Sequence, residues 1–419
     1  MLAERSHKLS ADIIIVGAGV AGVASAAVLG RQGWRVLLVD ARPACPPVFK
    51  AEKVERDELR LLADLGLLER LTPHAGLVSE TFAAYDGRVF RRLAAEHIGI
   101  AYADLVNTIR ANLPAAVETK VGYVNRISRK DETIRVRLAD GQELTARLVV
   151  VACGVGDELL SGLGLRRSVI QKEQCTALGF NIVAAGARTF PFQAVTYYAT
   201  DAASCIDYVT FFKIRDAMRA NLFVFRAESD PWIQEFHREP RAALERALPK
   251  LPRVIGEYEV AGKVVSGSVD LYRAEGEMPD GVVFIGDALQ SACPSTGLGL
   301  KKVFTDVAVL GECVPAWFST PGMSAGKLKS FYGDPRKRSR DSHALRQSFH
   351  HRRAAIDPSP RWRIHRALLH LKWRLSRPKD LPAYFREMNI KALNKGYEHG
   401  QKAKAGSPPE LEEVVYERE

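Results

Sequence analysis

The sequence has few cysteines, and they form no metal-binding pattern. There are six in 419 residues, with no C-x-x-C pair and no histidine cluster at zinc-ligand spacing. They are Cys45, Cys153, Cys175, Cys205, Cys293 and Cys313. This scatter indicates reduced thiols in a cytoplasmic protein, and it predicts no metal site.

Long uninterrupted apolar runs are also missing. No stretch of about 20 apolar residues could span a bilayer, and we expect no cleavable signal peptide. The apolar stretch 13–29 contains glycines and is followed at once by a strand and an acid. We therefore interpret it as part of a βαβ unit. No Ser-His-Asp set and no pair of carboxylates points to hydrolytic chemistry.

Acidic residues are scarce in one region of the chain. Between Pro335 and Lys379 there are 14 lysines and arginines and only two acids, a net charge of +12. The whole chain carries +11, so the remainder carries −1. The basic character therefore belongs to a C-terminal module. Because no nucleic-acid-binding signature accompanies this charge, we expect no nucleic-acid partner.

A glycine-rich turn near the N-terminus has the form of a dinucleotide fingerprint. The β-branched run 13–16 predicts a buried strand, and Gly17, Gly19 and Gly22 follow as G-x-G-x-x-G. A helix, a second strand and then Asp40 come next, with the acid about 20 residues after the glycines. The helix N-terminus offers N–H groups to phosphates, and the carboxylate suits a ribose. This order of elements predicts an ADP-containing cofactor.

A second glycine-rich turn lies more than half the chain away. Residues 282–285 predict another buried strand, and Gly-Asp stands at its end, at 286–287. The loop CPSTGLG at 293–299 leads into a helix predicted over 300–310. N–H groups at that helix start would stabilise negative charge on a reduced flavin.

The two turns resemble those of the FAD-dependent monooxygenases of the para-hydroxybenzoate hydroxylase type. That aromatic hydroxylase superfamily also includes flavin halogenases and geranylgeranyl reductases. Its GD motif is matched at 286–287 and its P-x-x-G-x-G loop at 294–299. The resemblance implies that FAD is the cofactor, that Asp287 binds its ribityl chain, and that the loop lies beside the flavin ring. It also implies a phosphate contact for Lys50, which stands where the family usually has arginine.

The residues expected at the cofactor come from three segments. The fingerprint and second strand contribute Gly17, Gly19, Val20, Ala21, Gly22, Asp40 and Ala41, and the next segment contributes Lys50. The second turn contributes Gly286, Asp287, Gly297, Leu298 and Gly299. The loop expected beside the flavin ring comprises Pro294, Ser295, Thr296 and Gly297, and no catalytic side chain is identified.

The resemblance also implies the fold. We expect an α/β protein with a Rossmann-like FAD-binding domain of the GR2 type, an antiparallel β-sheet substrate domain and a helical C-terminal extension. The expected FAD-binding domain is discontinuous and comprises 1–75, 100–165 and 280–330. The expected substrate domain comprises 76–99 and 166–279, and the basic helical module comprises 331–419.

Two segments depart from the family pattern. Strand 148–152 is followed by CGVGD at 153–157, where the family has an Asp-Gly motif tied to FAD and NAD(P)H binding. The electron source is therefore open between NAD(P)H and a separate flavin reductase. Tyr102 and Asp104 stand where the family usually has an arginine. The halogenase motif W-x-W-x-I-P is absent.

The resemblance implies an oxidoreductase that uses molecular oxygen. A monooxygenase of this kind acts through a C4a-hydroperoxyflavin and would hydroxylate or epoxidise a small apolar or aromatic metabolite. A flavin-dependent reductase of carbon–carbon double bonds, a flavin halogenase and a non-enzymatic FAD-containing binding protein are the alternatives. The aromatic, strand-like region 175–227 either fills a sheet core or lines a substrate pocket. Cys293 is either an inert loop thiol or a thiol with a redox role.

The basic module contains one amphipathic helix, predicted from 361 to the proline at 378. Its apolar residues form two stripes on opposite sides, with basic residues between them. One stripe comprises Ile364, Leu368, Leu371 and Leu375, and the other comprises Trp362, Leu369 and Trp373. Two interpretations are open. Either both stripes pack internally, or one docks on the enzyme body and the other contacts a partner helix or a membrane interface with anionic lipid.

Overall fold

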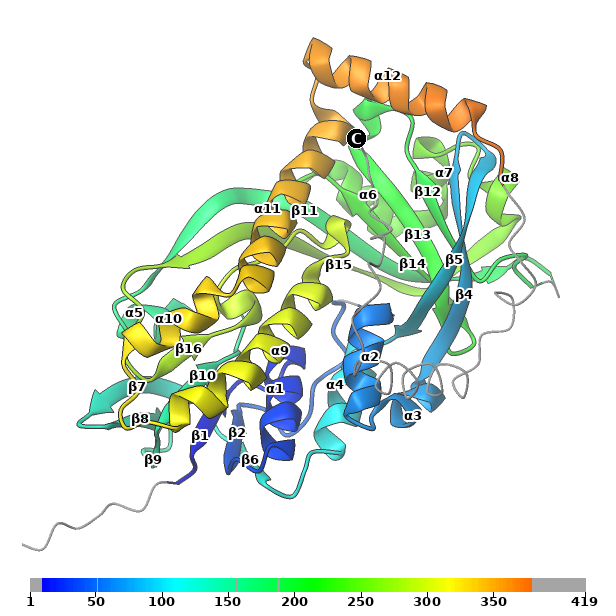
Figure 1. Cartoon of the computed structure of the whole chain (residues 1–419). Coiled ribbons are helices and arrows are strands. Elements are labelled where there is room, and N and C mark those ends of the chain that lie inside the picture. The colour runs from blue at the N-terminus through cyan, green and yellow to red at the C-terminus, as the bar shows by residue number, and fades with distance from the viewer. Residues whose placement is uncertain (1–9, 51, 155–156, 187–188, 379–419) are drawn as a thin grey trace, which may run out of the picture.

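The protein combines a parallel sheet, a large curled sheet and a set of C-terminal helices (Figure 1). The computed structural model describes residues 10–50, 52–154, 157–186 and 189–378. The predicted α/β class is confirmed, including the Rossmann-like parallel sheet. The domain boundaries given above stay a prediction.

The parallel sheet is assembled from distant parts of the chain. Its strand order is β16-β10-β1-β2-β6, and every neighbouring pair is parallel. The strands are β1 (Ile13–Val16), β2 (Val36–Asp40), β6 (Val117–Val121), β10 (Leu148–Val151) and β16 (Val282–Phe284). Because successive side chains of a strand point to opposite faces, Ile13 and Ile15 enter one core and Ile14 and Val16 enter another.

Helices cover one face of this sheet, and a small sheet covers the other. The helical face consists mainly of α1 (Val20–Arg31), α4 (Tyr102–Ala111), α9 (Gly299–Phe318) and α10 (Ala325–Gly333). The opposite face packs on β7 (Val124–Lys130), β8 (Thr133–Leu138), β9 (Glu143–Ala146) and α5 (Asp157–Gly162). The strands are therefore buried on both faces, as their continuous β-branched composition predicts.

The large sheet has eight strands in the order β15-β11-β14-β13-β12-β4-β5-β3. In that order their bounds are Tyr258–Glu275, Arg166–Ala184, Ala217–Val224, Ile206–Ile214, Ala194–Tyr198, Ala75–Tyr85, Arg88–Ile100 and Lys53–Glu55. One face packs on α6 (Pro231–Arg238), α7 (Pro240–Ala247) and α8 (Pro252–Ile255). The sheet is antiparallel apart from one pair, because β12 runs parallel to β4.

Four further helices complete the fold. They are α2 (Arg56–Asp64), α3 (Leu68–Leu71), α11 (Pro335–Ile356) and α12 (Pro360–Leu375), with four 3₁₀ turns at Thr72–His74, Ala202–Ser204, Gly286–Ala288 and Pro294–Thr296. Helix α11 packs on α9 and also on β11 and β13. Figure 1 shows it running from the parallel sheet to the large sheet. Among the described residues no helix combines the length and apolarity needed to cross a membrane.

The start of α2 contains a buried glutamate. The Glu58 carboxylate accepts a hydrogen bond of 3.1 Å from the backbone N–H of Glu55, which forms a capping box with the reciprocal bond. Burial, together with the neighbouring charge of Glu55, raises the pKa of Glu58 to about 7. The folded protein therefore holds a proton on Glu58 more tightly than the unfolded chain does.

Glu58 should make stability depend on pH. Since its folded pKa lies above its unfolded value, the free energy of unfolding should fall as pH rises from about 4.5 to about 7, by up to about 3 kcal/mol. Glu58→Gln should remove this part of the slope in denaturant unfolding at several pH values. Glu277→Gln, at an exposed glutamate, is the control and should keep the wild-type slope. Equal slopes for wild type and Glu58→Gln would show that Glu58 ionises normally.

Candidate flavin site

The two glycine-rich turns, far apart in sequence, lie against each other. Strands β1 and β16 are separated in the sheet by β10 alone, and both turns leave the carboxyl edge. A Cβ atom built on Gly286 would lie 3.3 Å from the Cβ of Ala21. The second turn therefore rests directly on the first turn of α1, where one extended ligand can reach both.

Glycine is required at two positions of the first turn. Gly17 has φ +100°, and a Cβ there would lie 2.6 Å from the Cα of Cys153. A Cβ on Gly22 would lie 1.8 Å from the carbonyl oxygen of Gly17. These contacts hold α1 close behind β1, which is the geometry that the fingerprint spacing predicts.

The N-terminus of α1 has buried donors without partners. The N–H of Val20 donates to the hydroxyl of Tyr102 at 3.1 Å. Within the described part of the chain, the N–H groups of Ala21 and Gly22 have no acceptor, although both residues are buried. Orphan donors at a helix N-terminus suit phosphate oxygens. Lys50 adds a positive charge nearby, with its ammonium 5.5 Å from the centroid of the Tyr102 ring.

Asp40 is held beside this turn by backbone donors. Its carboxylate accepts the N–H of Ala18 at 2.7 Å and the N–H of Arg42 at 2.8 Å. The residue is half-buried, whereas Ala41 is exposed. Asp40 thus ends β2 with its carboxylate next to the orphan donors. The ribose contact of Asp40 and the cofactor contacts of Ala41 and Lys50 stay predictions.

The second turn presents an exposed acid. Gly286 has φ +59°, and Asp287 after it is exposed. The backbone of Gly286 is fixed on both sides, because its N–H donates to Asp306 at 2.8 Å and its carbonyl accepts from Lys302 at 3.1 Å. An exposed carboxylate on a fixed turn fits the predicted contact with ribityl hydroxyls, which stays a prediction.

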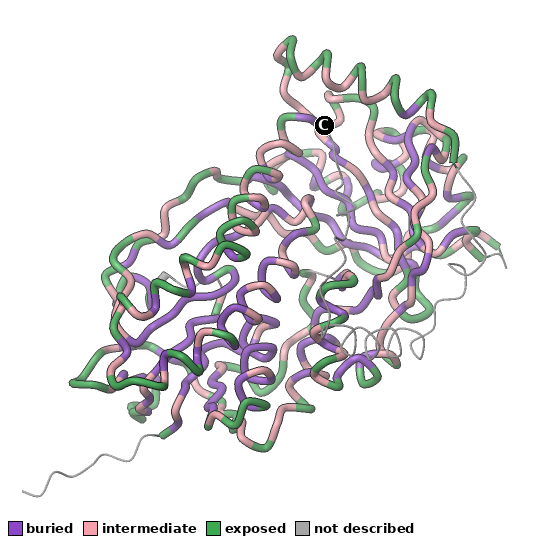
Figure 2. Tube along the Cα trace, viewed as in Figure 1, coloured by how far each residue is buried: buried purple, intermediate pink, exposed green. Residues whose placement is uncertain are grey.

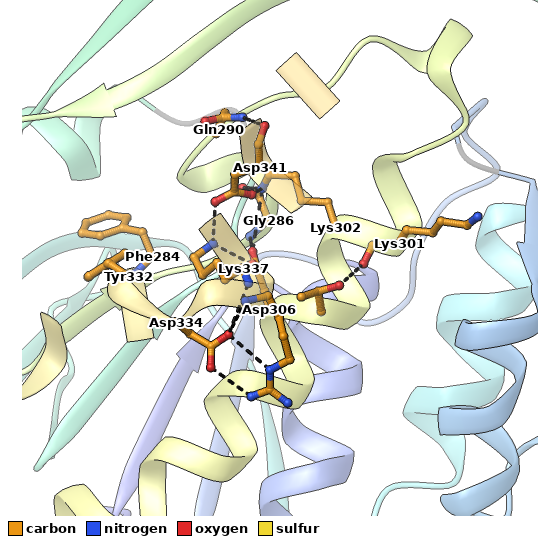
Figure 3. A network of polar contacts seen from close by, with 12 residues as sticks. Phe284, Gly286, Gln290, Lys301, Lys302, Asp306, Tyr332, Asp334, Lys337 and Asp341 are labelled. Atoms are coloured by element: carbon orange, nitrogen blue, oxygen red, sulfur yellow. Dashed lines mark hydrogen bonds and ion pairs between the residues drawn. The ribbon is translucent and has the colours of Figure 1, made fainter. Parts of the chain in front are cut away.

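Four charges hold this turn in place, of which Lys302, Asp306 and Lys337 are buried and Asp341 is partly buried (Figure 3). Lys337 from α11 donates to Asp306 of α9 at 2.6 Å and to Asp341 at 3.1 Å. Lys302 lies 3.7 Å from Asp306 and 3.6 Å from Asp341. We call Lys302, Asp306, Lys337 and Asp341 the buried tetrad. Its charges cancel, and it joins the C-terminal helix α11 to the Gly286 turn.

The balance of charges matters because three of the four tetrad side chains are removed from water. Lys302, Asp306 and Lys337 are each about as buried as a side chain can be, with 1% exposure. Although burial opposes it, the charges of Asp306 and Asp341 raise the pKa of Lys302. Lys302 therefore stays charged, and each ion depends on its neighbours for compensation.

The loop expected beside the flavin ring has an open side. It forms the 3₁₀ turn Pro294–Thr296 and then Gly297 with φ +66°. A Cβ on Gly297 or Gly299 would meet no atom within 4 Å. Leu298 between them is buried, and Gly299 begins α9. Open space at the N-terminus of a helix fits a planar ring with developing negative charge.

The other side of this loop packs against the large sheet. The hydroxyl of Tyr208 on β13 donates to the carbonyl of Ser295 at 2.6 Å. The buried thiol of Cys293 lies 3.2 Å from the Ser295 hydroxyl. An apolar cluster surrounds this contact, comprising Cys175, Ala177, Phe223, Phe225, Leu271 and Cys293. The aromatic region of the sequence therefore contributes residues both to the sheet core and to this cluster.

The two segments that depart from the family pattern both reach the first glycine-rich turn, through Cys153 and Tyr102. Cys153, after β10, is exposed and borders the Gly17 turn, while residues 155–156 of the CGVGD segment fall outside the described residues. Tyr102 contacts the fingerprint helix, whereas Asp104 pairs with Arg215 at 3.2 Å. No group of three or more potential metal ligands occurs in the described part of the chain.

Three residues support the site from a distance in roles that were not predicted from the sequence, although Tyr102 was noted there as a departure from the family pattern. Tyr102, Tyr208 and Lys337 reach it from α4, β13 and α11. The signal in the sequence was the i, i+4 pair of Lys302 and Asp306 in a mainly apolar helix.

Fold and site together define a dinucleotide-binding flavoprotein. A Rossmann-like parallel sheet with orphan helix donors, a strand-end acid and a second glycine turn fits FAD in each feature. The chain belongs to the FAD binding domain family, which it matches over residues 10–316. FAD is thus its cofactor and it is an oxidoreductase, as the resemblance to the aromatic hydroxylase superfamily implied.

Relatives and solved structures agree with this assignment. The chain is 26% identical over 345 residues to kynurenine 3-monooxygenase of Salinispora arenicola, covering 73% of this chain and 72% of that one. It is 25% identical over 353 residues to digeranylgeranylglycerophospholipid reductase of Methanosarcina acetivorans, covering 77% and 79%. The structure of p-nitrophenol 4-monooxygenase from Pseudomonas putida superposes with a TM-score of 0.70 at 17% identity, covering 94% and 98%.

Proposed function

We propose that the protein is a monooxygenase that hydroxylates or epoxidises a small apolar or aromatic metabolite with molecular oxygen. The observation that carries this proposal is the packing of the Pro294–Thr296 loop on an apolar and aromatic cluster of the large sheet. Apolar side chains at that loop would bind an apolar substrate and exclude water. The relatives named as monooxygenases support the same reaction class.

The residues of the chain have three tasks in this proposal. FAD supplies the electrons that activate oxygen. The N–H groups of Ala21 and Gly22 hold phosphates, and Asp287 orients the ribityl chain. Tyr208 fixes the loop beside the ring through its bond to Ser295. No side chain is required to transfer a proton in this arrangement.

We further propose that a separate flavin reductase delivers the electrons. The support is the CGVGD segment, which replaces the motif that the family uses for NAD(P)H. Anaerobic mixing of the purified protein with NADH or NADPH should leave its flavin spectrum oxidised until a flavin reductase is added. Rapid bleaching of the flavin by either nucleotide alone would contradict this part of the proposal.

A reductase of carbon–carbon double bonds is the second candidate, favoured by the relative named as a phospholipid reductase. The two functions differ in the fate of oxygen. With a panel of apolar and aromatic compounds under ¹⁸O₂, a monooxygenase gives products that contain the label. Products that gain two hydrogens under anaerobic conditions and never contain label would establish the reductase instead.

Tyr208 offers a test of the loop's role. Tyr208→Phe removes the only side-chain bond to the Ser295 carbonyl in the described residues and should misplace the loop. Product formation should fall about tenfold, with more oxygen consumed per product, while the flavin content stays unchanged. Tyr123→Phe, at an exposed tyrosine, is the matched control. A Tyr208→Phe enzyme with wild-type coupling of oxygen to product would exclude this role.

A further inference from the structure

The last described helix, α12, presents an apolar stripe to solvent. Ile364, Leu368, Leu371 and Leu375 are 60%, 61%, 52% and 74% exposed, and no other described helix has such a row. We propose that this stripe, with the basic side chains beside it, seats the protein on the surface of an anionic lipid bilayer. This proposal goes beyond the monooxygenase function and does not depend on it.

The opposite side of α12 is docked, which fixes where the stripe points. Trp373 is buried and stacks on Phe90, with ring centroids 4.9 Å apart, and it meets Tyr85 at 5.1 Å. The Tyr85 hydroxyl donates to the carbonyl of His370 at 3.0 Å. Arg88 donates to the carbonyl of Arg374, also at 3.0 Å. The β4–β5 hairpin thus holds α12 by one face and turns the other outward.

The outward face lies at the edge of the molecule. Figure 1 shows α12 beyond the end of the large sheet, and Figure 2 shows its exposed residues recurring along the helix. The sequence left open whether both stripes of this helix pack internally. The structure answers this for the described residues: the Trp373 stripe is internal and the leucine stripe is not.

The charges beside the stripe match an anionic surface. At about 100° per residue, Arg361 and Lys372 lie along one edge of the stripe, and Arg363 and Arg374 lie along the other. All four are exposed, and the sequence has no acid between Asp357 and Asp380. An apolar stripe with cations on both edges is the composition of a helix that lies in a membrane interface.

A second copy of the chain fits this face less well than lipid does. In a two-fold contact the same surface meets itself, so the basic edges of one stripe would face those of the other. No acid on α12 compensates that repulsion. Lipid phosphates supply the missing negative charge, and the acyl boundary accepts the leucines.

Vesicle sedimentation of the full-length protein tests the proposal. The protein should bind vesicles of phosphatidylcholine and phosphatidylglycerol, and bind less to phosphatidylcholine alone or at high salt. Leu368→Ser with Leu371→Ser should weaken binding about tenfold or more, because two interfacial leucines are lost. Arg363→Gln with Arg374→Gln should weaken binding to the anionic vesicles about fivefold for each arginine.

Matched controls separate this effect from misfolding and from self-association. Val183→Ser with Val265→Ser removes apolar side chains that are 48% and 39% exposed on the large sheet, and binding should not change. All variants should keep the wild-type thermal unfolding and flavin spectrum. Absence of vesicle binding, equal binding by the leucine variant, or a dimer that this variant converts to monomer would each overturn the proposal.

Discussion

Gly22→Ala should yield a protein that retains almost no flavin. The new methyl group would stand 1.8 Å from the Gly17 carbonyl oxygen, and neither can turn aside, because the methyl position is fixed by its Cα and the oxygen belongs to the backbone. Helix α1 would have to move away from β1, and its orphan N–H groups would leave the phosphate position. We expect FAD affinity to fall about a hundredfold or more, and the free energy of unfolding to fall by about 3 kcal/mol. Fluorescence titration with FAD and denaturant unfolding measure the two effects.

The control for this experiment is a glycine with room around it. A Cβ on Gly162, at the end of α5, would meet nothing within 4 Å, and its φ is not positive. Gly162→Ala should therefore keep both stability and flavin. If Gly22→Ala bound FAD as the wild type does, the close packing of α1 behind β1 would not be what forms the site.

Lys337→Met should cause the second large loss. It removes one cation from the buried tetrad and leaves Asp306 and Asp341 with Lys302 alone, a net buried charge of −1. Breaking a buried ion pair in this way costs about 3–5 kcal/mol of the free energy of unfolding. Because Asp306 also accepts the Gly286 N–H, flavin affinity should fall with stability.

A double variant separates the effect of the uncompensated charge from the effect of the lost hydrogen bonds. In Lys337→Met with Asp306→Asn, the remaining Lys302 and Asp341 balance, and an amide oxygen can still accept the Gly286 N–H. This variant should recover most of the stability lost by Lys337→Met alone. A double variant that is less stable than Lys337→Met would show that the separate contacts matter more than the uncompensated charge.

The sequence was sufficient to predict those features that contacts between neighbouring residues determine. The spacing of Gly17, Gly19 and Gly22 follows from backbone atoms that meet in one turn. The fingerprint turn could therefore be predicted without knowledge of the rest of the fold. The alternation of Ile13 to Val16 between two cores follows from the strand period. Helix α2 ends at Asp64, just before Gly66 with φ +64°, a helix-ending residue type that the sequence also shows.

The sequence was not sufficient to predict contacts between elements that are far apart in the chain. Tyr102 reaches the fingerprint from 82 residues away, and Lys337 reaches Asp306 across 31. Nothing in local propensity or periodicity selects such partners. Likewise, the two stripes of α12 were visible as a pattern, but only the aromatic ring contacts of Trp373 decide which stripe is covered.

We expect the two distant turns to bind the two halves of one FAD. The most direct test is to titrate wild type, Asp40→Ala and Asp287→Ala with FAD and with ADP. Asp40→Ala should weaken binding of both ligands, about tenfold or more, because the ribose contact belongs to the ADP half. Asp287→Ala should weaken FAD binding and leave ADP binding unchanged. If Asp287→Ala left FAD binding intact, or weakened ADP binding equally, the second turn would not bind the flavin half.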